Sequence, residues 1–61
     1  MNITIRINCD NAAFENDPSR EVARILHNLS VDIDETPIDP GDKITLFDLD
    51  DNYVDEYKVT R

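Results

Sequence analysis

The chain has little of what disulfide-bonded, membrane-spanning and nucleic-acid-binding proteins need. It has one Cys, one Gly and no Trp, and only six Lys and Arg stand against 14 Asp and Glu. The single Cys9 excludes an intramolecular disulfide, and no apolar run is long enough to span a membrane. A formal net charge of −8 disfavours direct binding to nucleic acid or anionic lipid, which depends largely on Lys and Arg. Because no signal-peptide pattern is visible either, we expect a protein of a reducing cytoplasm.

The residues that are present indicate one small domain, 1–61, that begins with a strand. Ile3, Ile5 and Ile7 alternate with polar residues, and this period of two predicts a half-buried strand over about residues 2–8. The apolar cluster Ala12-Ala13-Phe14 follows within a polar segment. We expect a loop or a single helical turn there that places Phe14 against the core.

Asp17-Pro18 predicts the start of a helix. An Asp can accept the free N–H groups of the first turn, and Pro at the first helical position sacrifices no hydrogen bond. An apolar stripe, which Ile33 would extend, consists of Val22, Ile25, Leu26 and Leu29. The polar side carries Arg20, Glu21, Arg24, His27 and Asn28. Because carboxylates are unfavourable near the negative end of the helix dipole, the helix should fray between Ser30 and Asp34, giving a helix over about residues 18–31.

The last third of the chain predicts a β-hairpin over about residues 43–60. Two strand-like runs flank the turn-forming residues Asp50-Asp51-Asn52. The order strand, helix, strand, strand is a β-α-β-β arrangement of the α+β class. A right-handed crossover, with the last strand inserted between the other two, gives a three-stranded antiparallel sheet in the order 1-3-2 with the helix packed on one face.

The open face of this sheet allows two interpretations. Alternation places Ile44 and Leu46 on one face of the second strand and Phe47 and Leu49 on the other face. In the third strand, Val54 lies on one face, and the other face carries Tyr53, Tyr57 and Val59. Either a bulge near Phe47 reorients the side chains, or the open face carries an apolar patch that contacts a partner or another copy. In the second case the homodimer face would consist of Phe47, Leu49 and Tyr57.

No motif in the sequence indicates catalysis or a cofactor. Cys9, Asp10 and His27 are the only candidates for a nucleophile, orienter and base, and nothing in their spacing brings them together. Asp48, Asp50 and Asn52 match the first three ligand positions of a calcium-binding loop, but Tyr53 and Val59 replace the Gly and Glu that such a loop requires. We therefore expect no enzymatic activity, no cofactor and no metal site.

The acidic residues are segregated along the chain. Residues 1–30 hold four acids and three bases, a net charge of −1, whereas residues 31–61 hold ten acids and three bases, a net charge of −7. Carboxylates on the hairpin could form a row that mimics a nucleic-acid backbone, or they could only maintain solubility and protect sheet edges. The predicted partner-binding acids are Asp48, Asp50, Asp51, Asp55 and Glu56, with Tyr53 and Tyr57 as aromatic anchors.

Three runs in the first half of the chain form a distinctive combination: Ile3-x-Ile5-x-Ile7, the run from Asp10 to Glu15, and Pro18-x-x-Glu21-Val22-Ala23-Arg24-Ile25-Leu26. In these runs the chain resembles small acidic accessory proteins of tailed bacteriophages and prophages. The resemblance implies a phage origin, an accessory, non-virion role and a location in the cytoplasm of a bacterial host cell. We therefore expect a non-enzymatic, stoichiometric binder or inhibitor of a host protein with a basic surface, in anti-defence or host takeover, with DNA mimicry as one form of the interaction. The alternative is a self-associating interaction module whose acidity serves solubility only.

Overall fold

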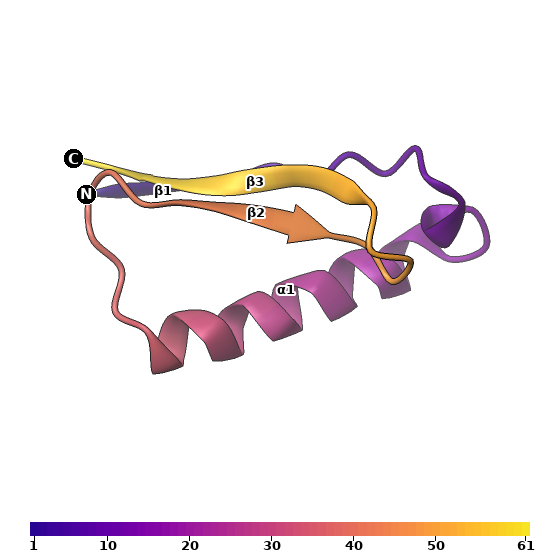
Figure 1. The fold of residues 1–61 in the computed structure, drawn as a ribbon. Helices are drawn as coiled ribbons and strands as arrows, with labels where there is room; N and C mark the ends of the chain where they lie inside the picture. Colours follow the sequence, from indigo (N-terminus) through magenta and orange to yellow (C-terminus); the bar gives the residue numbers. More distant parts are fainter.

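A three-stranded antiparallel sheet with one long helix along a single face makes up the fold (Figure 1). The computed structural model describes residues 1–61. Its elements are β1 (Asn2–Ile5), the short 3-10 helix η1 (Ala12–Phe14), α1 (Pro18–Glu35), β2 (Lys43–Phe47) and β3 (Tyr53–Thr60). The strand order β1-β3-β2 confirms the predicted α+β class and sheet topology.

The helix begins where the sequence predicts, and for the predicted reason. The side chain of Asp17 accepts a hydrogen bond from the Arg20 N–H at 3.1 Å, and Pro18 occupies the first helical position. The segment before it forms one 3-10 turn, and the side chain of Phe14 is only 1% exposed. The predicted placement of Phe14 against the core is confirmed.

The helix is longer and β1 is shorter than the sequence predicted. Helix α1 continues to Glu35, one turn beyond the predicted end. The extra turn is stabilised because it packs Ile33 against the core. Burying an Ile side chain is worth up to about 3 kcal/mol, whereas a charge at a helix terminus changes stability by roughly 0.3–1 kcal/mol. Strand β1 ends at Ile5, although the N–H groups of Arg6 and Asn8 still donate to β3 carbonyls at 3.1 and 2.6 Å.

A β-bulge in β3 decides which side chains reach the core. The register shifts between Leu46, which pairs with Asp55, and Phe47, which pairs with Tyr53, so Val54 is the extra residue. Simple alternation placed Val54 on the open face, but the bulge turns it inward and leaves it 0% exposed. Of the two interpretations of the open face, the bulge is confirmed.

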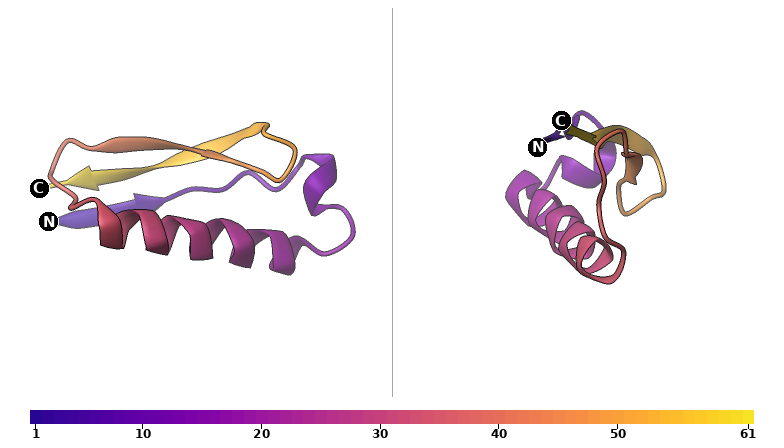
Figure 2. Two further views of the ribbon diagram at one scale, coloured as in Figure 1. Left: turned by 60° about the horizontal axis from the view of Figure 1, so that its bottom comes forward. Right: turned by 90° about the vertical axis from the view of Figure 1, so that its left-hand side faces the viewer.

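The core lies between α1 and the inner face of the sheet. The right-hand view of Figure 2 shows the helix and the sheet end-on. Its buried residues are Phe14, Ile25, Leu29, Leu46, Val54, Tyr57 and Val59. The outer face carries charged pairs instead: the Glu56 carboxylate lies 3.7 Å from both Lys43 Nζ and Lys58 Nζ. No helix of the structure combines the length and apolar character needed to cross a bilayer.

Candidate binding surface at the hairpin tip

Residues 47–53 comprise the tight turn between β2 and β3 together with the last residue of β2 and the first of β3, and we call them the hairpin tip. It lies beside the N-terminal end of α1, far from both chain termini (Figure 1). The Asp48 N–H donates to the Asn52 carbonyl at 2.9 Å, and the Asp51 N–H donates to the Asp48 carbonyl at 3.0 Å. Asp51 has a φ of 63°, in the left-handed region that Asp tolerates better than most residues. The tip is therefore a closed, hydrogen-bonded turn.

Asp48 organises this turn from the inside. Its side chain is only 3% exposed, and one carboxylate oxygen accepts the N–H groups of Asp50 and Asn52 at 2.9 and 3.0 Å. The other oxygen accepts the Asn11 side-chain amide at 3.0 Å, which connects the tip to the segment before η1. Burial by itself raises the pKa of Asp48, but the hydrogen bonds from Asn52, Asn11 and Asp50 together outweigh burial and lower this pKa. The carboxylate is held charged inside the turn.

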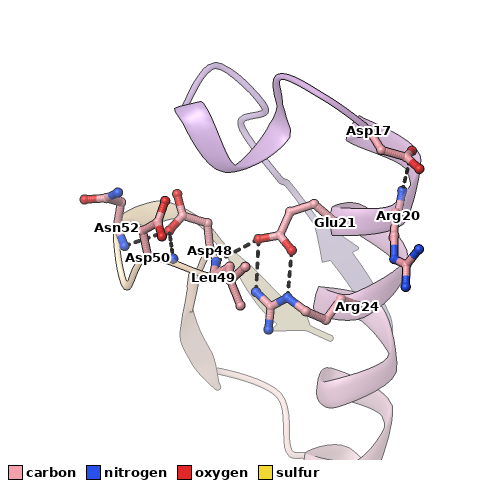
Figure 3. A network of polar contacts seen from close by, with 8 residues as sticks. All are labelled: Asp17, Arg20, Glu21, Arg24, Asp48, Leu49, Asp50 and Asn52. Atoms are coloured by element: carbon pink, nitrogen blue, oxygen red, sulfur yellow. Dashed lines mark hydrogen bonds and ion pairs between the residues drawn. The ribbon is translucent and has the colours of Figure 1, made fainter.

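Glu21 ties the tip to the helix (Figure 3). Its carboxylate is 6% exposed, accepts two hydrogen bonds from the Arg24 guanidinium at 2.7 and 3.1 Å, and accepts the Leu49 N–H at 2.7 Å. The hydrogen bonds from Arg24 are the main reason that the pKa of Glu21 is lowered, and the same pair raises the pKa of Arg24. Two buried carboxylates thus fix one short turn to two neighbouring segments.

A hollow of about 380 Å³ lies beside these contacts. It is lined by Ala13, Asn16, Asp17, Arg20, Glu21, Arg24 and Leu49. The hollow thus lies where η1, the first turns of α1 and the tip meet. Leu49, one of its lining residues, is 68% exposed.

The structure divides the predicted partner-binding acids into three groups. Asp48 lies inside the turn, and its carboxylate points to backbone N–H groups and not to solvent. Asp55 and Glu56 are partly buried and lie close to cations, with Asp55 3.6 Å from Arg6 Nε. Asp50 and Asp51 are exposed and belong to no ion pair. The tip therefore exposes these last two carboxylates to solvent.

The predicted aromatic and apolar contacts also divide. Tyr53 is 61% exposed, Phe47 51% and Leu49 68%, so all three are available at the tip. Tyr57 is 5% exposed and belongs to the core, because it lies on the helix side of β3. The predictions that Tyr57 is an aromatic anchor for a partner and part of a homodimer face are therefore both wrong.

The sequence pattern places Glu21 on the polar side of the helix, but the structure buries its carboxylate. The spacing to Arg24 is a detectable signal, since residues three apart on a helix are neighbours. Nothing in the sequence indicates that the backbone of Leu49 completes this carboxylate's contacts. No group of three His, Cys, Asp or Glu side chains in the chain is arranged to hold a metal ion.

No protein-family model, curated protein or solved structure matches the chain.

Proposed function

We propose that the protein is a small, non-enzymatic binding protein that engages a basic surface of a partner protein through its hairpin tip. The observation that carries this proposal is the contrast between the two sides of the tip. Inward, two buried carboxylates pin the turn; outward, the same turn exposes Phe47, Leu49 and Tyr53 beside the free carboxylates of Asp50 and Asp51. Exposed apolar side chains on a turn fixed by buried charges contribute little to folding, so a binding role accounts for them better.

The chemistry of the tip specifies the kind of partner. Aromatic side chains surrounded by charges are typical of the residues that dominate binding energy, and the two Asp residues complement Arg and Lys. Because the turn is already fixed by hydrogen bonds, little conformational entropy is lost on binding. The resemblance to phage accessory proteins supports a host protein as the partner, bound stoichiometrically in anti-defence or host takeover.

Affinity purification from a bacterial lysate tests this proposal. The bait is the whole chain, compared with D50N/D51N and with L49S/Y53S. All four positions are exposed, so both variants should fold as the wild type does, and Asn at position 51 tolerates the left-handed backbone. We expect proteins retained by the wild type to be lost from both variants, and their retention by the wild type to weaken with salt.

The matched control is D34N/D39N, which makes the same change at two exposed Asp residues outside the tip. It should retain the partners of the wild type. If D50N/D51N and L49S/Y53S retained them as well, the tip would not be the binding surface. If D34N/D39N lost them as readily as D50N/D51N, net charge and not the tip would govern binding.

A further inference from the structure

A second hollow lies at the other end of the molecule, where α1 ends and the linker to β2 begins. Its volume is about 250 Å³. It is lined by Leu29, Asp32, Glu35, Thr36, Pro37, Asp42, Ile44 and Tyr57. This end holds the chain termini and the last turn of the helix, well away from the hairpin tip (Figures 1 and 2).

Three of the lining residues are carboxylates without a cation. Asp32 and Glu35 lie in the last turns of α1, Asp42 lies in the linker, and none of the three forms an ion pair. The last turn of the helix contains no basic residue, so the negative end of its dipole adds to these charges. The linker is fixed, since the Val59 N–H donates to the Asp42 carbonyl at 2.9 Å and the Gly41 N–H to the Val59 carbonyl at 2.8 Å.

Tyr57, a buried residue whose hydroxyl has no partner in the chain, lines the same hollow. Tyr57 is only 5% exposed, yet its hydroxyl takes part in none of the side-chain hydrogen bonds of the chain. No fully buried side-chain oxygen lacks a partner, so this hydroxyl must reach solvent. Tyr57 is one of the residues that line the hollow. Because the chain supplies no hydrogen-bond partner for its hydroxyl, this group is left to bond with solvent or with a ligand in the hollow.

We propose that this hollow binds a Lys or Arg side chain of a partner protein. The alkyl stem would lie against Leu29, Ile44 and the Tyr57 ring, while the cation meets the carboxylates at the rim and an N–H donates to the Tyr57 hydroxyl. The volume is below the roughly 300–1,000 Å³ of pockets for drug-sized ligands and suits a single side chain. The three carboxylates do not converge as a metal site does.

The proposed occupant of the hollow is thus an elongated cation with an apolar stem. This site is independent of the function proposed for the hairpin tip, because it lies at the opposite end of the chain's fold and shares no residue with it.

The test is an NMR titration of the ¹⁵N-labelled whole chain with blocked pentapeptides. Gly-Ser-Arg-Ser-Gly and Gly-Ser-Lys-Ser-Gly carry the proposed group, and Gly-Ser-Gln-Ser-Gly is the uncharged probe. We expect saturable shifts confined to backbone amides around residues 29–36, 42–44 and 57 with the first two peptides, and none with the third. In D32N/E35Q the affinity should fall about tenfold, and in Y57F about threefold.

The matched control is D10N/E15Q, which removes the same two charges from exposed positions near η1. Its affinity should stay within about twofold of the wild type, because exposed charges at such distance are largely screened. Y57F removes a hydroxyl that bonds to nothing in the chain, so an unchanged melting temperature verifies that lost binding is not lost folding.

Three results would overturn the proposal. Unsaturable shifts spread over all exposed acids would indicate nonspecific charge attraction. Equal losses in D32N/E35Q and D10N/E15Q would show that net charge, not the hollow, binds the cation. Spermidine is a free polyamine of the same alkylammonium chemistry; displacement of the peptides by lower concentrations of spermidine would assign the hollow to free polyamines instead of a protein.

Discussion

At the scale of single residues, the acidic side chains of this protein fall into two populations that composition does not separate. Asp48 and Glu21 are buried and bound by several N–H donors, so each contributes to the fold as a charged acceptor. Most other carboxylates are exposed. Both populations consist of Asp and Glu, so residue type alone does not distinguish them. The difference matters in a chain of this size, because its total stability amounts to only a few kcal/mol.

We expect Asp48→Asn to destabilise the protein by about 1–3 kcal/mol at pH 7, since its amide nitrogen would meet the donating amide of Asn11. The lowered pKa fixes the pH dependence. Because the folded pKa of Asp48 lies below its ordinary 3.8, its stabilisation is full above about pH 3.8 and is lost as pH falls through the folded pKa. The stability difference between wild type and variant should therefore shrink below about pH 4.

Denaturant unfolding of the two proteins between pH 7 and pH 2.5 measures this difference. Asp50→Asn is the control, because the Asp50 side chain is exposed and accepts no hydrogen bond in the turn. A difference between wild type and D48N that stayed constant down to pH 2.5 would contradict a charged, stabilising Asp48.

At the scale of elements, the bulge in β3 decides how one helix can cover a sheet whose strands are apolar on both sides. Strict alternation would have exposed Val54, but one extra residue turns it to the helix side with Tyr57 and Val59. The backbone strain falls on Asp55, whose φ of 117° is far from the values that non-Gly residues adopt. The apolar residues of the hairpin strands do not keep to strict alternation, which indicated a bulge near Phe47. The pattern did not indicate that Val54 is the extra residue.

The bulge reverses the usual ranking of Gly and Ala in a strand. We expect Asp55→Gly to be more stable than Asp55→Ala by about 1 kcal/mol, because both lose the weak pair with Arg6 and only Gly adopts this φ without strain. Melting temperatures of the two variants measure the effect. At the exposed strand position Lys58, where the backbone is regular, Lys58→Gly should be less stable than Lys58→Ala. A lower melting temperature for D55G than for D55A would contradict a strained Asp55.

At the scale of the whole molecule, the fold redistributes a charge that the sequence shows only as acidic in its second half. Four of the cations pair with acids: Arg24 with Glu21, Arg6 with Asp55, and Lys43 and Lys58 with Glu56. The unpaired carboxylates gather instead at the two ends of a molecule 36 Å long, beside η1 and the hairpin tip and around the helix C-terminus. The hairpin strands therefore do not present a continuous acidic row.

Repulsion among these unpaired acids should make the stability depend on salt. We expect the melting temperature to rise by roughly 4–8 °C between 10 and 150 mM NaCl, corresponding to about 1 kcal/mol, because the Debye length falls from about 30 to about 8 Å. The exposed ion pairs weaken at the same time, but each contributes at most about 1 kcal/mol and most contribute less. Calorimetry measures the shift, and D32N/D34N, which relieves the crowding at the helix end, should respond less to salt. A melting temperature that fell with added salt would show that attraction, not repulsion, dominates.

The sequence by itself determined the element order, the capped start of the helix, the sheet topology and the core positions of Phe14, Ile25 and Leu29. These features depend on local propensity and on periodicity, which are properties of neighbours along the chain. Tertiary structure alone decided the extra helical turn held by Ile33, the inward rotation of Val54, and the burial of Glu21 and Asp48. The physical reason is that a carboxylate's environment is set by donors distant in sequence, such as the Leu49 N–H 28 residues beyond Glu21. It is this long-range pairing that separates the buried acids that stabilise the fold from the acids left free at the surface.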